Sequence, residues 1–311
     1  MRVTAILGGL IAAALWAAAT LASSRSSRML GSRVVLGWVM LIGVIIGVPL
    51  AFIDAPVERL ELGTLALLLL AGLSYVGGLG LTYAALQIGK VSIVAPIVAT
   101  EGAVAALIAI WLGDPVTLAA GVILAVIAVG VVLSSLERSG TDVPAGDIDL
   151  VADALDGPPT TSALSHTPPV APGDARKSAL LAIGAALIFG VGLVSMGTAA
   201  SLVPLAWVAL TARLVGVVAI TLPLLLRGRL RVTRAALPLL VIAGVGEIFG
   251  SMASAWGARE SIAIVAVLGS QFAAFSAVAA FLLFGERLSR VQVIGVVLVV
   301  AGVTALAVVQ A

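Results

Sequence analysis

Apolar residues occur in runs of about 20 positions, and short polar or turn-forming stretches separate the runs. An α-helix of that length crosses the roughly 30 Å hydrocarbon core of a membrane. The pattern predicts an all-α integral membrane protein with ten transmembrane helices, five in each half of the chain. We place them at 3–23, 33–53, 62–84, 91–112, 115–136, 178–200, 204–226, 235–256, 261–284 and 290–309.

A polar segment at 137–177 separates the two halves. It holds six prolines and seven acidic residues and shows no hydrophobic period. Because such a segment cannot bury enough apolar surface to offset its chain entropy, we expect a disordered cytoplasmic linker. The predicted organisation is a first repeat at 1–136, the linker, and a second repeat at 178–311.

Composition narrows the possible functions. Hydrophobic residues make up 61% of the chain and charged residues 10%, which argues against a water-soluble enzyme. The chain has no cysteine, and its single histidine, His166, lies in the linker, so neither thiol nor histidine chemistry is expected in the helices. We therefore predict no catalytic site, no metal and no cofactor. The net charge of +2 does not indicate a nucleic-acid partner.

Lysine and arginine residues fall at the ends of the apolar runs and favour one orientation. With the N-terminus outside, the cytoplasmic loops carry thirteen of them, whereas the opposite orientation leaves three inside. Because cytoplasmic loops are enriched in Lys and Arg, we expect both termini outside the cell membrane. The first run also has features of a signal peptide, but its length and the similar run after Lys177 favour a helix.

The two halves show an internal repeat. Ile93-Val94-Ala95 aligns with Ile264-Val265-Ala266, and continuing without gaps pairs Thr100 with Gln271. Because each half holds an odd number of predicted helices, two copies would lie upside down relative to each other. Inverted-topology repeats are typical of secondary transporters.

Several short motifs, in the same order in both halves, resemble the EamA-like members of the drug/metabolite transporter superfamily. The resemblance implies ten helices and solute transport by alternating access without ATP, commonly export of amino acids or related metabolites. One departure is Gly113-Asp114-Pro115, where a glycine-glutamate-arginine element is expected. The motifs are Leu15-Trp16-Ala17, Tyr83-Ala84-Ala85-Leu86, the run from Gly89 to Ile97, Phe189-Gly190, Phe284-Gly285-Glu286-Arg287-Leu288-Ser289, Gln292, Gly295 and Gly302.

Three ionisable side chains lie near the middle of predicted helices: Glu101, Arg213 and Glu247. An ionisable group at that depth costs about 2.5–3.5 kcal/mol, so it usually faces a cavity or a partner. We interpret Glu101, next to a helix kink expected at Pro96, as a residue that binds solute and protons. The alternative is a glutamic acid that only packs helices.

Glu247 lies on a face of small residues that includes Gly244 and Gly250, and the corresponding run at 62–84 has glycines around Tyr75. Glycine-interrupted helices at corresponding positions of two halves indicate a central site. We therefore interpret Glu247 as a second site residue. The alternative is that the glycines only permit tight helix packing.

Four further residues complete the predicted site. Arg213 would either bind a solute carboxylate or neutralise a glutamate in a structural ion pair. Gln271 would line the same cavity or form a hydrogen bond in the core. Trp16 and Tyr75 would form cavity walls or bind a cation through their rings.

The function that fits these residues best is a proton-coupled secondary transporter that exports a small polar metabolite such as an amino acid. The first alternative is a carrier that exports hydrophobic or quaternary cations; a membrane enzyme or a passive channel fits poorly. The expected partners are the solute, protons and the lipid bilayer. The helices at 115–136 and 290–309 are expected to be scaffold or the surface of a homodimer.

Overall fold

The computed structural model describes residues 3–54, 61–88, 94, 97–135, 172–272, 274–275, 278–279 and 289–310, and every regular element in them is a helix. The first half contains α1 (Val3–Leu30), α2 (Ser32–Asp54), α3 (Leu62–Ile88), α5 (Glu101–Trp111) and α6 (Leu118–Ser135). The second half contains α8 (Pro172–Ala200), α9 (Leu205–Gly216), the π-helical turn η2 (Val217–Thr221), α10 (Leu222–Leu226), α11 (Leu237–Ala258), α12 (Ile262–Gly269) and α14 (Arg290–Gln310).

Most of these helices have the length and composition of membrane spans. Three shorter helices in the described residues are also apolar: Glu101–Trp111, Leu118–Leu133 and Arg290–Leu306. The prediction of an all-α fold is confirmed for this part of the chain. The six long stretches are Val3–Ser27, Ser32–Ile53, Leu62–Thr82, Arg176–Ala200, Leu205–Leu226 and Leu237–Ala258.

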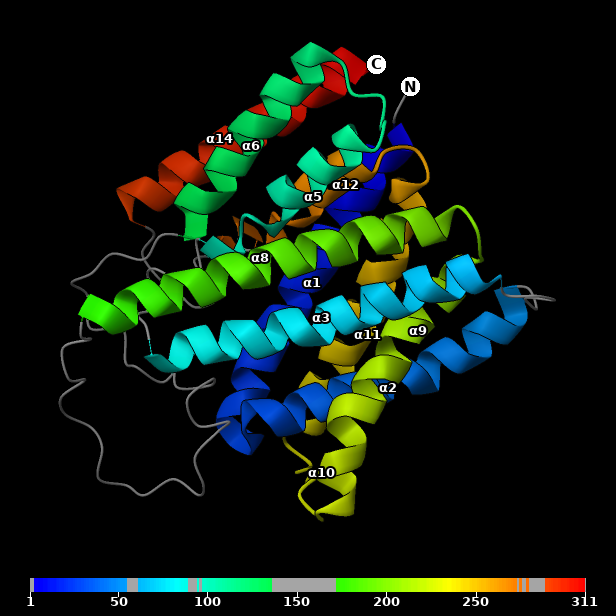
Figure 1. Cartoon of the computed structure of the whole chain (residues 1–311). Coiled ribbons are helices and arrows are strands. Elements are labelled where there is room, and N and C mark those ends of the chain that lie inside the picture. The colour runs from blue at the N-terminus through cyan, green and yellow to red at the C-terminus, as the bar shows by residue number, and fades with distance from the viewer. Residues whose placement is uncertain are drawn as a thin grey trace.

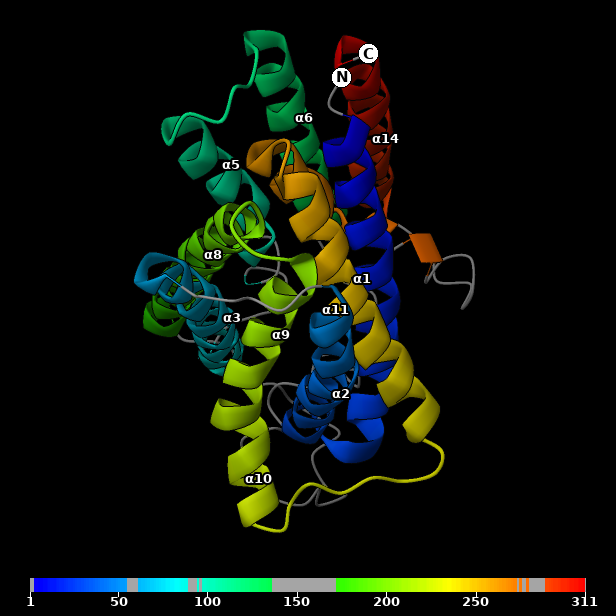
Figure 2. The same cartoon turned by 90° about the vertical axis from the view of Figure 1, so that its right-hand side faces the viewer.

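Helices of the first half pack mainly on helices of the second. α1 runs along α11, and α3 runs along α8 (Figures 1 and 2). α6 and α14 form a further pair at one side of the molecule, while α2 packs on α9 and α5 packs on α12. The start of α1 and the end of α14 lie at the same end of the molecule (Figures 1 and 2).

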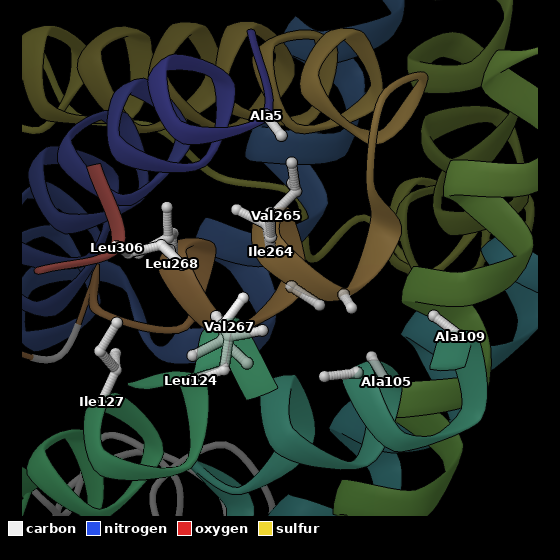
Figure 3. Packing of buried hydrophobic residues seen from close by; sticks show 14 of the residues in the cluster. Ala5, Ala105, Ala109, Leu124, Ile127, Ile264, Val265, Val267, Leu268 and Leu306 are labelled. Carbon is white, nitrogen blue, oxygen red and sulfur yellow. The ribbon is translucent and has the colours of Figure 1, made fainter. Parts of the chain in front are cut away.

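The largest buried apolar cluster joins α5 and α6 of the first half to α12 of the second, with α1 and α14 at its edge (Figure 3). Many of its members are alanine or valine, and small residues allow membrane helices to approach closely. Glycine permits one such close approach between α1 and α11, where a Cβ on Gly8 would lie 2.7 Å from the Cα of Gly257.

Two helix ends differ from the prediction. α1 continues past residue 23 to Leu30. The Ser26 hydroxyl donates to the carbonyl oxygens of Ala22 and Ser23 in the same helix, so this polar side chain is satisfied without water and does not end the helix. α8 begins at Pro172, so the last residues of the predicted linker are helical; proline is favoured in the first turn of a helix. The expected disorder of the rest of the linker concerns residues outside the described ranges.

The predicted helices 91–112 and 261–284 are both interrupted. α5 begins only at Glu101, after a turn at residues 99–100, and α12 ends at Gly269, before a turn at residues 270–271. These turns include Thr100 and Gln271, which the sequence alignment of the halves pairs with each other. The kink expected at Pro96 lies outside the described residues.

Candidate functional site

A cavity of about 280 Å³ lies between the two halves. Helices α1, α3 and α5 of the first half and α8, α9 and α11 of the second contribute its walls, together with Phe272 just after α12. This volume is close to the lower end of the range of small-molecule sites. Its polar lining residues are Thr20, Thr82, Glu101, Arg213, Glu247 and Ser251, and its aromatic ones are Trp16, Tyr75, Phe189 and Phe272.

Arg213 and Glu247 form an ion pair at the cavity. Arg213 Nη2 lies 3.1 Å from Glu247 Oε2 and also donates to the Glu247 carbonyl oxygen and to Ser251 Oγ, each at 2.8 Å. Ser251 in turn donates to the Glu247 carbonyl oxygen at 2.9 Å. The arrangement ties α9 to α11, and it matches the structural alternative that the sequence analysis left open for Arg213.

The Arg213 side chain is enclosed by its neighbours. Arg213 is 1% exposed, and its guanidinium carbon lies 5.5 Å from the centre of the Tyr75 ring. Its aliphatic part fills a notch at α2, because a Cβ on Gly43 would lie 2.9 Å from Arg213 Cδ. A guanidinium over an aromatic ring gains a cation–π interaction. Tyr75, which the sequence predicted as a wall or a cation-binding ring, therefore faces an internal cation.

Glu101 has a different environment. It is the first residue of α5, half-buried, and lines the cavity. Among the described residues no Lys or Arg forms an ion pair with it. Its neighbours in the lining include Val98 on the preceding segment. The N-terminus of a helix stabilises a negative charge, so the position of Glu101 at the start of α5 favours its carboxylate form.

Two aromatic rings lie against glycines of the opposite half. A Cβ on Gly250 of α11 would lie 2.7 Å from Trp16 Cδ1, and one on Gly78 of α3 would lie 2.6 Å from Phe189 Cε1. Phe189 also meets Tyr75 edge-to-face, with the ring centres 6.3 Å apart. The missing side chains at the two glycines thus give the rings room beside the cavity.

The structure brings five of the six predicted residues to one cavity: Trp16, Tyr75, Glu101, Arg213 and Glu247. Gln271 is not among the lining residues. It is 1% exposed, and neither its amide nitrogen nor its oxygen has a hydrogen-bond partner in the described structure.

Sequence reasoning missed two aromatic residues of the lining. The available signal was the repeat: the alignment that pairs Thr100 with Gln271 also pairs Glu101 with Phe272, and the motif at Trp16 corresponds to that at Phe189. Phe189 and Phe272 could therefore have been predicted as lining residues from their counterparts in the first half, Trp16 and Glu101.

At one end of the molecule, two carboxylates connect the halves. Asp114 Oδ2, after α5, accepts from the Ser261 hydroxyl at 3.0 Å and from the Ala263 N–H at 2.9 Å, at the start of α12. Glu260 accepts from the Thr4 hydroxyl at 2.8 Å and from the Ala5 N–H at 3.1 Å, at the start of α1. The hydrogen bond from Thr4, with smaller help from the backbone, lowers the pKa of Glu260.

Comparison with known proteins agrees with this architecture. The model of the EamA-like transporter family matches residues 3–136 and again 176–308. No curated protein matches the chain. One solved structure, described only as the crystal structure of a protein, aligns over 99% of this chain and 98% of its own with a TM-score of 0.76 and 16% identity. Identity this low shows a shared fold and says nothing about the solute.

Proposed function

The chain belongs to the EamA-like transporter family, and from this premise we propose that it is a secondary carrier that exports a small polar metabolite by alternating access. The observation that carries the proposal is the cavity, which is lined by helices of both matched halves and holds three ionisable side chains. A central site between two halves can be exposed to each side in turn when one half rocks against the other.

The packing of the helices supports two inverted copies. If α1 corresponds to α8 and α3 to α11, then the pair α1 with α11 and the pair α8 with α3 are the same contact made twice. The rings follow the same rule, since Trp16 of α1 lies against Gly250 of α11 and Phe189 of α8 lies against Gly78 of α3. Two five-helix copies inserted in opposite directions would generate this exchange of partners.

Glu101 is the residue that we propose exchanges protons with solute. Its carboxylate lines the cavity without a basic partner in the described residues, whereas Glu247 is held by Arg213. A single carboxylate that binds either a proton or the solute couples the two movements. With both termini outside and the carrier in the cell membrane, the proton gradient would drive the solute out.

The test uses the full chain in proteoliposomes loaded with a mixture of amino acids and organic amines, with a pH gradient that is acidic outside. We expect saturable loss of a subset of solutes, measured by mass spectrometry, together with proton entry reported by an internal dye. Glu101→Gln should abolish both signals, and Glu61→Gln, an exposed carboxylate before α3, should leave them unchanged. Efflux that does not saturate would indicate a channel, and solute loss without proton entry would contradict the coupling.

A further inference from the structure

We infer that the carried solute is an organic monocation, a protonated or quaternary amine with an apolar body, and that Glu101 is its counter-ion. The inference rests on the carrier function proposed above and changes its solute, from the small polar metabolite to the cations of the alternative carrier. It starts from the charges of the described lining. The titratable and charged groups that share the cavity with Glu101 are Tyr75 on α3, Arg213 on α9 and Glu247 on α11; the lining positions of α1 and α8 add none.

Arg213 offers an anionic solute no free bidentate edge. A guanidinium binds a carboxylate bidentately through one of two edges, and both edges include Nη2. In this chain Nη2 already donates to the Glu247 carboxylate, the Glu247 carbonyl and Ser251. The adjacent Nε is buried, without a partner in the described residues, and lies out of reach of a solute in the cavity. A solute carboxylate that bound bidentately would have to displace Glu247 and leave that carboxylate unpaired.

The hydroxyl groups of the lining offer acceptors, because their protons are already used. Thr20 donates to the Trp16 carbonyl at 2.7 Å, and Thr82 donates to the Gly78 carbonyl at 2.8 Å. Each threonine oxygen keeps its capacity to accept. A protonated amine carries hydrogen-bond donors and no acceptor, so it complements these oxygens and Glu101, whereas a carboxylate does not.

The rest of the lining suits an apolar, cationic body. The rings of Trp16, Phe189 and Phe272 come from three different helical segments around the cavity. Aromatic faces attract cations, and the attraction increases when the cation is desolvated. Glu101 would then hold the charge of the solute while the rings contact its carbon atoms.

One consequence separates this solute class from a zwitterion. If Glu101 binds either one proton or one monocation, each cycle exchanges one positive charge for another. Exchange of a monocation is then electroneutral and responds to the pH gradient but not to the membrane potential. A net-neutral zwitterion exchanged for a proton would move charge.

The binding experiment uses three probes of nearly equal size: 2-phenylethylamine, phenylalanine and 3-phenylpropionate, with phenyltrimethylammonium as a quaternary cation of similar size. Calorimetry on the detergent-solubilised full chain should show binding of the two cations, and binding of phenylalanine and phenylpropionate weaker by about tenfold or more. Glu101→Gln should weaken amine binding by about tenfold, and Glu101→Asp should retain most of it. Stronger binding of the zwitterion or the anion, or no binding of either cation, would overturn the inference.

The transport experiment separates this inference from the proposed function. Proteoliposomes with an acidic lumen should accumulate phenyltrimethylammonium, which has no neutral form that could cross the bilayer unaided, and a potassium-diffusion potential should not alter the final ratio. Cation binding without any exchange would contradict the carrier function and leave the binding class standing. Exchange driven by membrane potential would contradict the one-for-one exchange with Glu101 as the shared ligand.

Discussion

The two halves of the chain provide the same packing positions around the cavity but different chemistry. Arg213 of α9 lies against Gly43 of α2, and Met40 of α2 lies against Gly216 of α9, where a Cβ would come within 2.7 Å of Met40 Cγ. Residues 40 and 213 are separated along the chain by the same interval as 16 and 189. The arginine of the second half thus corresponds to a methionine of the first.

The other two ionisable residues show the same asymmetry. Glu247 precedes Gly250 by three positions, as Tyr75 precedes Gly78, and the repeat alignment pairs Glu101 with Phe272. Tyr75, Phe272 and the three ionisable residues line the cavity, whereas Met40 and these glycines are not among its lining residues. Duplication therefore accounts for the shape of the site, whereas its charges occur in one copy each. The two halves therefore share the packing around the cavity and differ in its charges.

The largest effect is expected when the charge asymmetry is removed at Arg213. Arg213→Met gives the second half the residue of the first and leaves the Glu247 carboxylate without its partner. Breaking a buried ion pair on one side costs about 3 kcal/mol or more. The melting temperature of Arg213→Met in detergent should therefore fall strongly. It is measured by size-exclusion chromatography of samples heated to a series of temperatures.

The double variant Arg213→Met with Glu247→Gln is the control for that prediction. It removes both charges, so most of the lost stability should return, since no unpaired carboxylate remains. If the double variant is as unstable as the single one, the packing of the Arg213 stem at Gly43, and not the ion pair, is what stabilises this contact between α9 and α2.

The sequence predicted the helices and the three ionisable residues because both depend on local properties. Long apolar runs identify membrane helices, and a charge within such a run stands out against its neighbours. The pairing of Arg213 with Glu247 was left as one of two alternatives because the two residues lie on different helices. Only the crossing of α9 and α11 brings their side chains within 3.1 Å.

Gln271 shows why the remaining part of the site was harder to predict. The alignment put it next to the position that corresponds to Glu101, and the sequence analysis therefore placed it at the wall of the same cavity or in the core. In the structure α12 ends at Gly269, and the chain turns at Gln271, so its side chain points into the protein. Periodicity predicts faces only while a helix continues.

A smaller effect is expected from filling the two glycine notches. Gly250→Ala would push a methyl group against the Trp16 ring, and Gly78→Ala would push one against the Phe189 ring. Overpacking of this kind costs about 1–3 kcal/mol and shifts the ring it touches. Both variants should weaken binding of 2-phenylethylamine by a similar factor in calorimetry, because the notches are equivalent.

Gly80→Ala is the matched control, since it lies in the same helix as Gly78 and no atom would lie within 4 Å of its Cβ. Its binding constant should stay at the parent value. If only Gly250→Ala weakens binding, then Trp16 contacts the solute and Phe189 does not. That result would contradict the proposed equivalence of the two rings.

The smallest effect is expected at Glu260, one of the two carboxylates that connect the halves at one end of the molecule. Glu260 is exposed, so its hydrogen bond with Thr4 contributes little, and removing it in Thr4→Val should lower the melting temperature by only about 1–2 °C at neutral pH. Because the pKa of Glu260 is lowered from its usual 4.5 in the folded protein, this contribution is fully present above pH 4.5.

The same contribution disappears as the pH falls through the lowered pKa of Glu260, because the protonated carboxyl has lost its charge-assisted hydrogen bonds. The difference in melting temperature between the parent and Thr4→Val should therefore be constant from pH 7 to about 4.5 and shrink below it. Thr304→Val removes a hydroxyl that donates to its own helix at Val300, so its effect should not vary with pH. A difference for Thr4→Val that persists in acid would mean that Thr4 stabilises α1 by itself, without joining it to the second half.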